Sequence, residues 1–427
     1  MMICVKVRFT ANVGFRRVTV EQLVRELFRR APGPDDDAWW AASGGLALTG
    51  WPDGAYPLPP RSLVPYLRSV GEVIEELTTR LGAGVGLDTG AIVGERAAVA
   101  GFSRNGQRSC GGATELLRAS DGWAAVSLAR PDDVQLLPAW LGTEDVATGI
   151  GERAASELVA SAAELGIPCA RLGEIDATRP PVHVADLSAG PPAGLLADVT
   201  IIDLSALWAG PLCGHVLTAA GARTIKVESR NRPDGARRGP AASYDLLHAG
   251  QESVALDFGD AGDRRRLHAL LSHADVVIEG SRPRALAQLG VDARAVATSN
   301  PAVWVSITGY GRTLLEGQRV AFGDDAAVAG GLVADDGSGP VFCADAIADP
   351  LAGMAAAACA LAALAAGGGW LVDVSMAAVA AWCARLPRPG EVWSGPVAPP
   401  RARAPTGRAA ELGRDNERVL GALGVSP

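Results

Sequence analysis

The sequence contains little lysine and has no excess of positive charge. Of the 39 lysine and arginine residues in its 427 residues, only Lys6 and Lys226 are lysine. The formal net charge is −8, which argues against a general nucleic-acid binder, since such proteins are normally basic. Hydrophobic residues make up 48% and charged residues 20%, so disorder throughout the chain is excluded and two to three globular domains are expected.

Cysteine and histidine are also sparse and scattered. The seven cysteines form no C-x-x-C pair, and none of the five histidines stands at zinc-ligand spacing from a cysteine. We therefore expect neither a disulfide framework nor a metal site, and a location in the reducing cytoplasm. The longest apolar run, Leu351–Ala366, is mostly alanine and shorter than a membrane span, so it predicts a buried helix. Residues 1–30 lack the apolar stretch of a secretory signal.

Turn-rich stretches divide the chain into five segments. The first contains a strand-like alternation at Val5–Phe9 and a short helical pattern at Val20–Phe28. The second is helical, above all at Ser69–Arg80. The third contains a hairpin around Asp121-Gly122 and a helix over Glu152–Leu165. The predicted segments are an N-terminal extension of unknown role (1–37), a helical segment (38–100), a small α+β domain (101–190), a larger α/β domain (195–390) and a C-terminal tail (391–427).

In the fourth segment short apolar strands alternate with helices, which predicts an α/β fold: a doubly wound, parallel, Rossmann-like sheet beside the second, smaller domain. Such sheets bind ligands where their strands end. The loop after the first strand, Ser205–Pro211, is not G-x-G-x-x-G, which argues against a dinucleotide enzyme. The expected strands are Val199–Leu204, Thr224–Val227, Ser253–Leu256, Ala274–Glu279 and Val303–Ile307.

Two stretches of the second segment are echoed near the end of the fourth. Gly44-Gly45-Leu46 resembles Gly330-Gly331-Leu332 at an offset of 286, and Gly86-Leu87-Asp88 resembles Leu371-Val372-Asp373 at an offset of 285. Chance similarity between glycine- and alanine-rich segments is one explanation. The other is a truncated first copy of a module that is complete in the second half, with the first copy supplying only packing surface.

The second half resembles the class III CoA-transferases, the CaiB/BaiF family, over roughly residues 195–385. Residues 100–190 resemble the small domain of that family, which normally follows the nucleophile region, so the order is permuted. The resemblance rests on an ordered set of motifs: Ile202–Pro211, Gly221–Glu228, Ser253–Asp257, Ala274–Glu279 with Arg282-Pro283, Asn300-Pro301, Val305–Gly311, Ala348–Met354 and Val372–Met376.

The resemblance implies that Asp349 is a nucleophile. It would attack an acyl-CoA thioester to give a mixed anhydride and then an aspartyl-CoA thioester, from which a carboxylic acid takes the CoA. The alternative is structural, because Asp349 followed by Pro350 is an ordinary helix start. In either case a helix N-terminus should keep Asp349 ionised, and its exposed amides could stabilise negative charge. The first copy has Val64 and Pro65 at the corresponding positions, so it is predicted to be catalytically silent.

The resemblance also implies a set of residues that contact coenzyme A. Several cations usual in the family are missing, since Gln251 and Glu252 precede one strand and Gln288 follows the Arg-Pro turn. Arginines near the strand ends, among them Arg232 and Arg284, could compensate because arginine binds phosphate bidentately. The predicted contacts are Trp208, Ala209, Arg230, Gln251, Gly280, Ser281 and Arg282.

The function expected from the resemblance is transfer of CoA from an acyl-CoA to a small carboxylic acid by an interlocked homodimer whose site is completed by both chains, without a metal, a nucleic acid or a membrane. A catalytically degenerate CoA-binding protein or subunit is the alternative suggested by the missing cations. A 2-methylacyl-CoA racemase is a weaker alternative, because no histidine follows His273 to serve in an acid–base pair.

Overall fold

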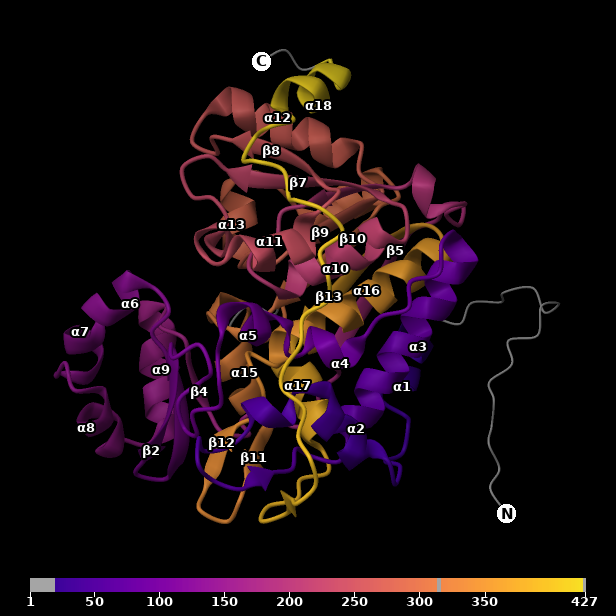
Figure 1. Cartoon of the computed structure of the whole chain (residues 1–427). Helices are drawn as coiled ribbons and strands as arrows, with labels where there is room; N and C mark the ends of the chain where they lie inside the picture. Colours follow the sequence, from indigo (N-terminus) through magenta and orange to yellow (C-terminus); the bar gives the residue numbers. More distant parts are fainter. Residues whose placement is uncertain (1–19, 313–315, 425–427) are drawn as a thin grey trace.

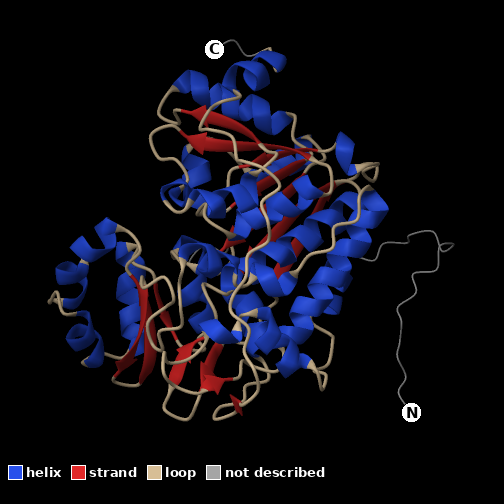
Figure 2. Ribbon diagram, in the orientation of Figure 1, coloured by secondary structure: helices blue, strands red, loops and turns tan. Residues whose placement is uncertain are grey.

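A seven-stranded sheet with helices on both faces forms the largest part of the protein, with a smaller sheet and an N-terminal helical segment beside it (Figures 1 and 2). The arrangement is taken from a computed structural model that describes residues 20–312 and 316–424. The predicted strand at Val5–Phe9 lies outside the described residues. The predicted helical pattern at Val20–Phe28 is confirmed as α1, Val20–Leu27.

The large sheet has the order β5-β13-β10-β9-β6-β7-β8, and its pairings are parallel except that of β5 with β13. From β6 the chain winds outwards through β7 and β8, then returns to β9 on the other side of β6, which makes the β6–β9 boundary the switch point. The predicted α/β fold is confirmed. The strands are β5 Val182–Ser188, β6 Thr200–Asp203, β7 Arg223–Ser229, β8 Glu252–Leu256, β9 Val276–Glu279, β10 Val303–Thr308 and β13 Gly369–Ser375.

Each face of the sheet packs on its own set of helices. Neighbouring residues of β6 show the alternation: Ile201 joins the core under α10 and α16, whereas Ile202 joins the core under α12, α13 and α14. The helices of this unit are α10 Ala209–Ala219, α11 Ala241–His248, α12 Ala261–Ser272, α13 Pro283–Gln288, α14 Ala293–Ser299, α15 Gly323–Ala329, α16 Ala348–Ala366, α17 Met376–Ala384 and α18 Asn416–Ala422.

Helix α16 is buried around its whole circumference, with sixteen of its 19 residues inaccessible. By length and composition it could cross a membrane, but 89% of its apolar window lies inside the protein, as in the central helix of a folded core. The prediction of a buried helix here is confirmed. The helix approaches α10 very closely, because a Cβ on Gly353 would lie 2.5 Å from the carbonyl oxygen of Ala209.

The smaller sheet and its helices fall within the predicted α+β segment. The hairpin around Asp121-Gly122 and the helix that ends at Gly166 are both confirmed. Strand β5 lies before the predicted boundary at residue 190 but belongs to the large sheet, where it is a partly exposed edge strand without an apolar run. The elements are β2 Thr114–Ala119, β3 Gly122–Ser127, β4 Cys169–Arg171, α6 Pro131–Gln135, α7 Leu137–Leu141, α8 Val146–Gly151 and α9 Ala155–Leu165.

The N-terminal segment packs along the large unit. Helix α3 lies beside α16, and the Tyr66 hydroxyl donates to the Leu351 carbonyl at 2.6 Å (Figure 1). Its strand β1 (Tyr56–Pro57) pairs with β14 (Val392–Trp393) near the C-terminal end of the chain. Strands β11 (Val333–Asp335) and β12 (Pro340–Phe342) form a separate short hairpin. The helices of the segment after α1 are α2 Asp36–Ser43, α3 Leu63–Leu81, α4 Thr89–Ile92 and α5 Glu95–Ala100.

The close approach of α10 and α16 predicts the effect of a single methyl group. Gly353→Ala should lower the free energy of unfolding by about 1–3 kcal/mol, because the two helices must move apart. Gly421→Ala is the matched control, since Gly421 is exposed in α18 and a Cβ there meets nothing within 4 Å; it should raise stability by up to ~1 kcal/mol. Urea titration measures both, and equal effects would contradict the packing described.

Candidate functional site

Asp349 lies in the first turn of α16, next to residues from the N-terminal segment and from α15. Its side chain is half-buried. Gly323 makes room for it, because a Cβ at that position would lie 2.4 Å from Asp349 Oδ2. The alternative role as an N-cap is wrong: the helix begins one residue earlier, at Ala348, and no side chain caps it. The carboxylate is therefore not used to close the helix end.

A strained turn precedes this helix. Ala344 and Ala346 have positive φ angles of 55° and 43°, a conformation that costs a residue with a Cβ about 1–3 kcal/mol. The amide of Ala344 donates to Thr49 Oγ1 at 3.1 Å, and the amide of Ala346 donates to Asp324 Oδ1 at 2.9 Å. Contacts from two distant parts of the chain thus hold the backbone that leads into Asp349.

Arg96 of α5 anchors the same turn. Asp345, between the two strained alanines, is fully buried and forms a bidentate pair with Arg96, with Nε 2.8 Å from Oδ2. The guanidinium also lies 5.4 Å from the centre of the Trp208 ring, which is itself buried. Trp208, predicted to contact CoA, therefore packs against the arginine beside Asp349.

Two further carboxylates come from α15. The Asp325 carboxylate accepts from the Phe322 amide at 2.8 Å and from the Ser127 hydroxyl at 2.9 Å, both through Oδ1. Its other oxygen, Oδ2, is buried and has no hydrogen-bond partner among the described residues. Together with Asp324 and Asp345, this residue gives Asp349 three acidic neighbours and one basic one.

This environment sets the protonation of the site. Burial raises the pKa of Asp349 to about 7; Arg96 opposes the shift, and the three neighbouring carboxylates add to it. Burial similarly raises the pKa of Asp324 to about 6 and that of Asp325 to about 7. The expectation that the helix N-terminus keeps Asp349 ionised is thus wrong, because burial outweighs the helix end. Perturbed carboxyl groups of this kind cluster at functional sites.

Fewer backbone amides of the first turn of α16 are available to stabilise negative charge than the sequence suggested. The Asp349 amide already donates to the Ala346 carbonyl at 2.9 Å, and Pro350 has no N–H. The nearest group of positive charge is the Arg96 guanidinium, two of whose nitrogens hold Asp345. Arg96 is therefore the group that favours the ionised form of Asp349.

The predicted loop residues at the switch point come together. Ala209 opens α10 directly after β6, and Gly280 and Ser281 follow β9, the strand beside it. The loop after β6 is also strained: Leu207 has a φ of 70°, and its amide donates to Asp234 at 3.0 Å. A doubly wound sheet binds its ligands in the crevice between these loops.

Arginines without nearby carboxylates surround the same edge. Arg282 is exposed, and its pKa is lowered by partial burial and then by the positive charges of Arg284, Arg130 and Arg232. Arg130 is neutralised by Asp133, but no ion pair is formed by Arg232, Arg282 or Arg284 within the described part of the chain. Arg230, at the end of β7, is exposed as well. A multiply charged anion would relieve this repulsion.

Gln251 does not join this group. It precedes β8, next to the start of β7, so it lies at the amino ends of the strands, away from the loops that follow their carboxyl ends. Its side chain is buried: Oε1 accepts from His248 Nδ1 at 2.8 Å, and Nε2 donates to the Leu247 carbonyl and to Thr218 Oγ1. The predicted contact with CoA would require these bonds to break.

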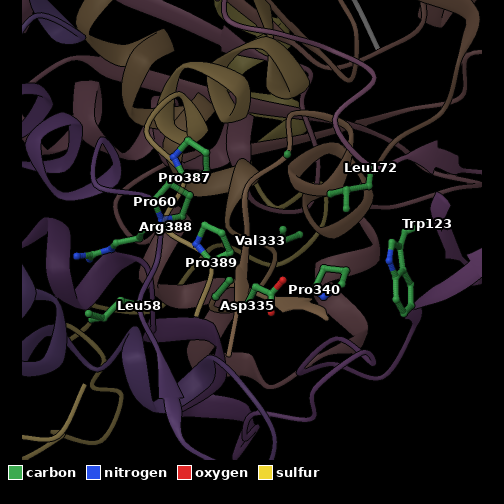
Figure 3. Close-up of a pocket in the computed structure, with 12 residues that line it drawn as sticks. Leu58, Pro60, Trp123, Leu172, Val333, Asp335, Pro340, Pro387, Arg388 and Pro389 are labelled. Carbon is green, nitrogen blue, oxygen red and sulfur yellow. The ribbon is translucent and has the colours of Figure 1, made fainter. Parts of the chain in front are cut away.

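A cavity of about 310 Å³ lies away from Asp349, where the N-terminal segment, the small sheet and β11–β12 meet (Figure 3). Its walls are mostly apolar, with Trp123 and Leu172 on one side and Pro387 and Pro389 on the other. None of the residues predicted for the site lines it.

Sequence reasoning missed four residues of the site: Arg96, Asp324, Asp325 and Asp345. The Asp324-Asp325 pair was visible next to a helical pattern, but nothing local links it to Asp349. Arg96 lies 249 residues before Asp345 in the chain. Only the packing of α5 against the turn brings them together, so no spacing rule could find the pair.

The raised pKa of Asp349 predicts how stability changes with pH. The folded chain holds this proton more tightly than the unfolded chain, whose pKa is about 4, so the stabilisation is present below that value and is lost as pH rises towards 7. Asp349→Asn should therefore lose less free energy of unfolding between pH 5 and pH 7 than the wild type, by up to ~1.4 kcal/mol per pH unit. Asp198→Asn, at an exposed carboxylate, is the control. Parallel curves for wild type and Asp349→Asn would contradict the prediction.

Known proteins are similar to part of the chain. It is 33% identical over 129 residues to an acetyl-CoA:oxalate CoA-transferase of Acetobacter aceti, covering 29% of this chain and 33% of that one. It is 29% identical over 205 residues to a succinyl-CoA–D-citramalate CoA-transferase of Chloroflexus aurantiacus, covering 44% and 51%. A solved CAIB/BAIF family protein from Brucella suis is 26% identical, covers 45% of this chain and 55% of its own, and superposes with a TM-score of 0.40.

The matched part is limited in extent. The chain spans between a third and a half of the length of these curated relatives. The profile of CoA-transferase family III matches residues 196–409, half of the chain, including the switch-point loops, Asp324, Asp345 and Asp349. The protein belongs to CoA-transferase family III.

Proposed function

We propose that this protein transfers coenzyme A from an acyl-CoA to a carboxylic acid, with Asp349 as the nucleophile. The observation that carries the proposal is the position of Asp349: a half-buried carboxylate, free of any capping role, near Arg96, which itself packs on Trp208. Membership of the family supports the reaction class. A non-catalytic CoA-binding protein is the outcome if no covalent chemistry occurs.

The proposed reaction uses two anhydrides. The Asp349 carboxylate attacks the thioester carbonyl, the C–S bond breaks, and CoA leaves as a thiolate. The thiolate then attacks the Asp349 carbonyl, which releases the first acid and leaves an aspartyl-CoA thioester. An acceptor carboxylate attacks that thioester and again expels the thiolate, which takes the new acyl group and restores the free carboxylate.

Arg96 and the acidic neighbours have separate parts in this scheme. Arg96 lowers the pKa of Asp349 and so favours the ionised, nucleophilic form, while burial favours the protonated form. The nearby Arg96 guanidinium would stabilise the negative charge that develops on the attacked carbonyl oxygen. These opposing effects leave the pKa of Asp349 at about 7.

The basic cluster at the strand ends is the proposed binding site for the phosphates of CoA. Arg232, Arg282 and Arg284 gather exposed positive charge next to the switch-point loops. The relatives named above act on oxalate or citramalate, which suggests a small acid as acceptor. A cytoplasmic location stays a prediction from the cysteine pattern.

Asp349→Ala tests the nucleophile. It should reduce CoA transfer by at least about 10³-fold, as expected when a covalent nucleophile is removed. Incubation of the wild type with a panel of acyl-CoAs, followed by hydroxylamine and peptide mass analysis, should place a hydroxamate on residue 349 alone. Asp198→Ala is the control and should keep full transfer. Transfer by Asp349→Ala would exclude the mechanism, and CoA binding without any adduct would favour the non-catalytic alternative.

Substitution of Arg282 tests the phosphate site. Arg282→Gln should weaken CoA binding by roughly ten- to a hundredfold, since a charge-assisted hydrogen bond contributes about 1.5–3 kcal/mol, and the weakening should shrink at high salt. Arg223→Gln makes the same charge change at the amino ends of the strands, where Arg223 pairs with Glu252 at 2.9 Å. Isothermal titration calorimetry with CoA compares them. Equal affinities for the two variants would remove Arg282 from the proposed site.

A further inference from the structure

The N-terminal segment and the region around α16 share the same order of structural features. Helices α3 and α16 both contain 19 residues, and both their first and their last residues are 285 positions apart. Pro65 and Pro350 occupy the third position of their helices. The same offset separates Gly86-Leu87-Asp88 from Leu371-Val372-Asp373. A chance likeness between alanine-rich stretches does not explain equal helix bounds.

Hydrogen bonds within the N-terminal segment up to Gly106 (the first copy) correspond to hydrogen bonds within the region around α16 (the second copy). The Gly106 amide donates to the Gly50 carbonyl, and the Gly390 amide donates to the Asp335 carbonyl, each at 2.9 Å. The donors are 284 positions apart and the acceptors 285. Both donor glycines have positive φ angles, 66° and 78°. The two segments therefore close their chains in the same way.

The contacts between the copies are reciprocal. The Leu58 amide donates to the Glu391 carbonyl at 2.9 Å, and the Phe342 amide donates to the Gly106 carbonyl at 3.0 Å. In the first bond the donor belongs to the first copy and the acceptor to the second, and in the second bond the reverse holds. The two donors are 284 positions apart and the two acceptors 285. Tyr66 and Leu351, which are equivalent to each other, are in direct contact. Reciprocal contacts and contacts between equivalent residues are what a two-fold axis produces between identical subunits.

The positions that this two-fold axis relates to the charged residues of the site hold uncharged residues. At an offset of 285, Asp349 corresponds to Val64, Asp345 to Pro60 and Arg96 to Ala381. A cavity of about 100 Å³ is lined by Pro60 and Val64 at the equivalent place. Its charged residues, Asp36, Asp37, Arg61 and Arg388, do not stand at the offset of 285 from any charged residue of the site. The carboxylate, its buried acidic neighbour and the arginine across the axis have all been replaced, so the second site is silent.

We propose that the N-terminal segment takes the place of a second subunit, so that a single chain holds one complete site in which Arg96 of the first copy positions Asp349 of the second. The face of α16 that an equivalent helix of another chain would cover is already covered by α3. The homodimer expected from the family resemblance is therefore not required. The inference rests on the proposed function only where activity is the readout.

Arg96 acts here as a positioning residue through Asp345. Arg96→Met should shift the pH profile of adduct formation at residue 349 to higher pH, since the pKa of Asp349 rises further when the cation is lost. Arg96→Lys keeps the charge and should restore part of the profile. A merely structural role would lower the rate without moving the profile, and that result would overturn the assignment.

Complementation tests whether Arg96 and Asp349 act within one chain. Arg96→Met and Asp349→Asn chains, co-expressed with different tags, should not co-purify, and adduct formation should keep the pH profile of Arg96→Met alone, because neither chain contains a complete site. Mixed particles that regain the wild-type pH profile would overturn the proposal, since each chain would then supply what the other lacks. Arg96→Lys can replace Arg96→Met where the latter does not fold.

Two measurements decide the inference without any activity. Light scattering of the wild type should give the mass of one chain, and its thermal midpoint should be unchanged over about a hundredfold range of concentration. A mass of two chains, or a midpoint that rises with concentration, would overturn the claim that the first copy replaces a subunit. If no acyl-CoA forms an adduct while these two results hold, the proposed function fails and the inference stands.

Discussion

The need to cover α16 on every side governs the arrangement of this protein. A helix that is apolar around its circumference must be enclosed completely, and here the sheet, α10, α17 and α3 enclose it. Its alanines and Gly353 let these neighbours come close, because they add little volume between the backbones. The N-terminal segment is consequently part of the core, although it lies outside the part of the chain that matches the family. Asp349, at the beginning of this helix, is fixed by the same packing.

The charge balance at Asp349 differs from that of the one-to-one ion pairs at the strand ends. Buried carboxylates at the strand ends have their own cations: Arg312 lies 2.7 Å from Glu279, and Arg237 pairs with Glu228. Beside Asp349, the Arg96 guanidinium interacts with three carboxylates, those of Asp345, Asp324 and Asp349 itself. An unpaired buried charge is costly, so an excess of carboxylates over cations needs a reason. A second shared cation, Lys226 with Asp203 and Asp234, contacts the loop after β6.

The sequence predicted the helices and strands better than it predicted which of their residues contact one another. The parallel strands, the hairpin at Asp121-Gly122 and the buried helix after Asp349 follow from local apolar patterns, and all are present. Strand β5 was not recognised because an edge strand has only one apolar neighbour and carries polar residues. The protonation of Asp349 could not be foreseen, since it depends on burial and on Asp324, Asp325 and Asp345. Arg96 could not be found at all, because its partner is defined by tertiary packing.

The C-terminal tail completes the connection between the two copies. It runs the length of the molecule in Figure 1, from α17 past α4 and α5 to β8. Arg403 pairs with buried Glu95 at 2.7 Å and donates to His215, whose pKa burial lowers to about 3, so that the ring stays neutral and accepts. Glu95 is the neighbour of Arg96 in α5. The tail thereby holds the helix that presents Arg96, and a contact made more than 300 residues away in the chain secures the position of the cation beside Asp349.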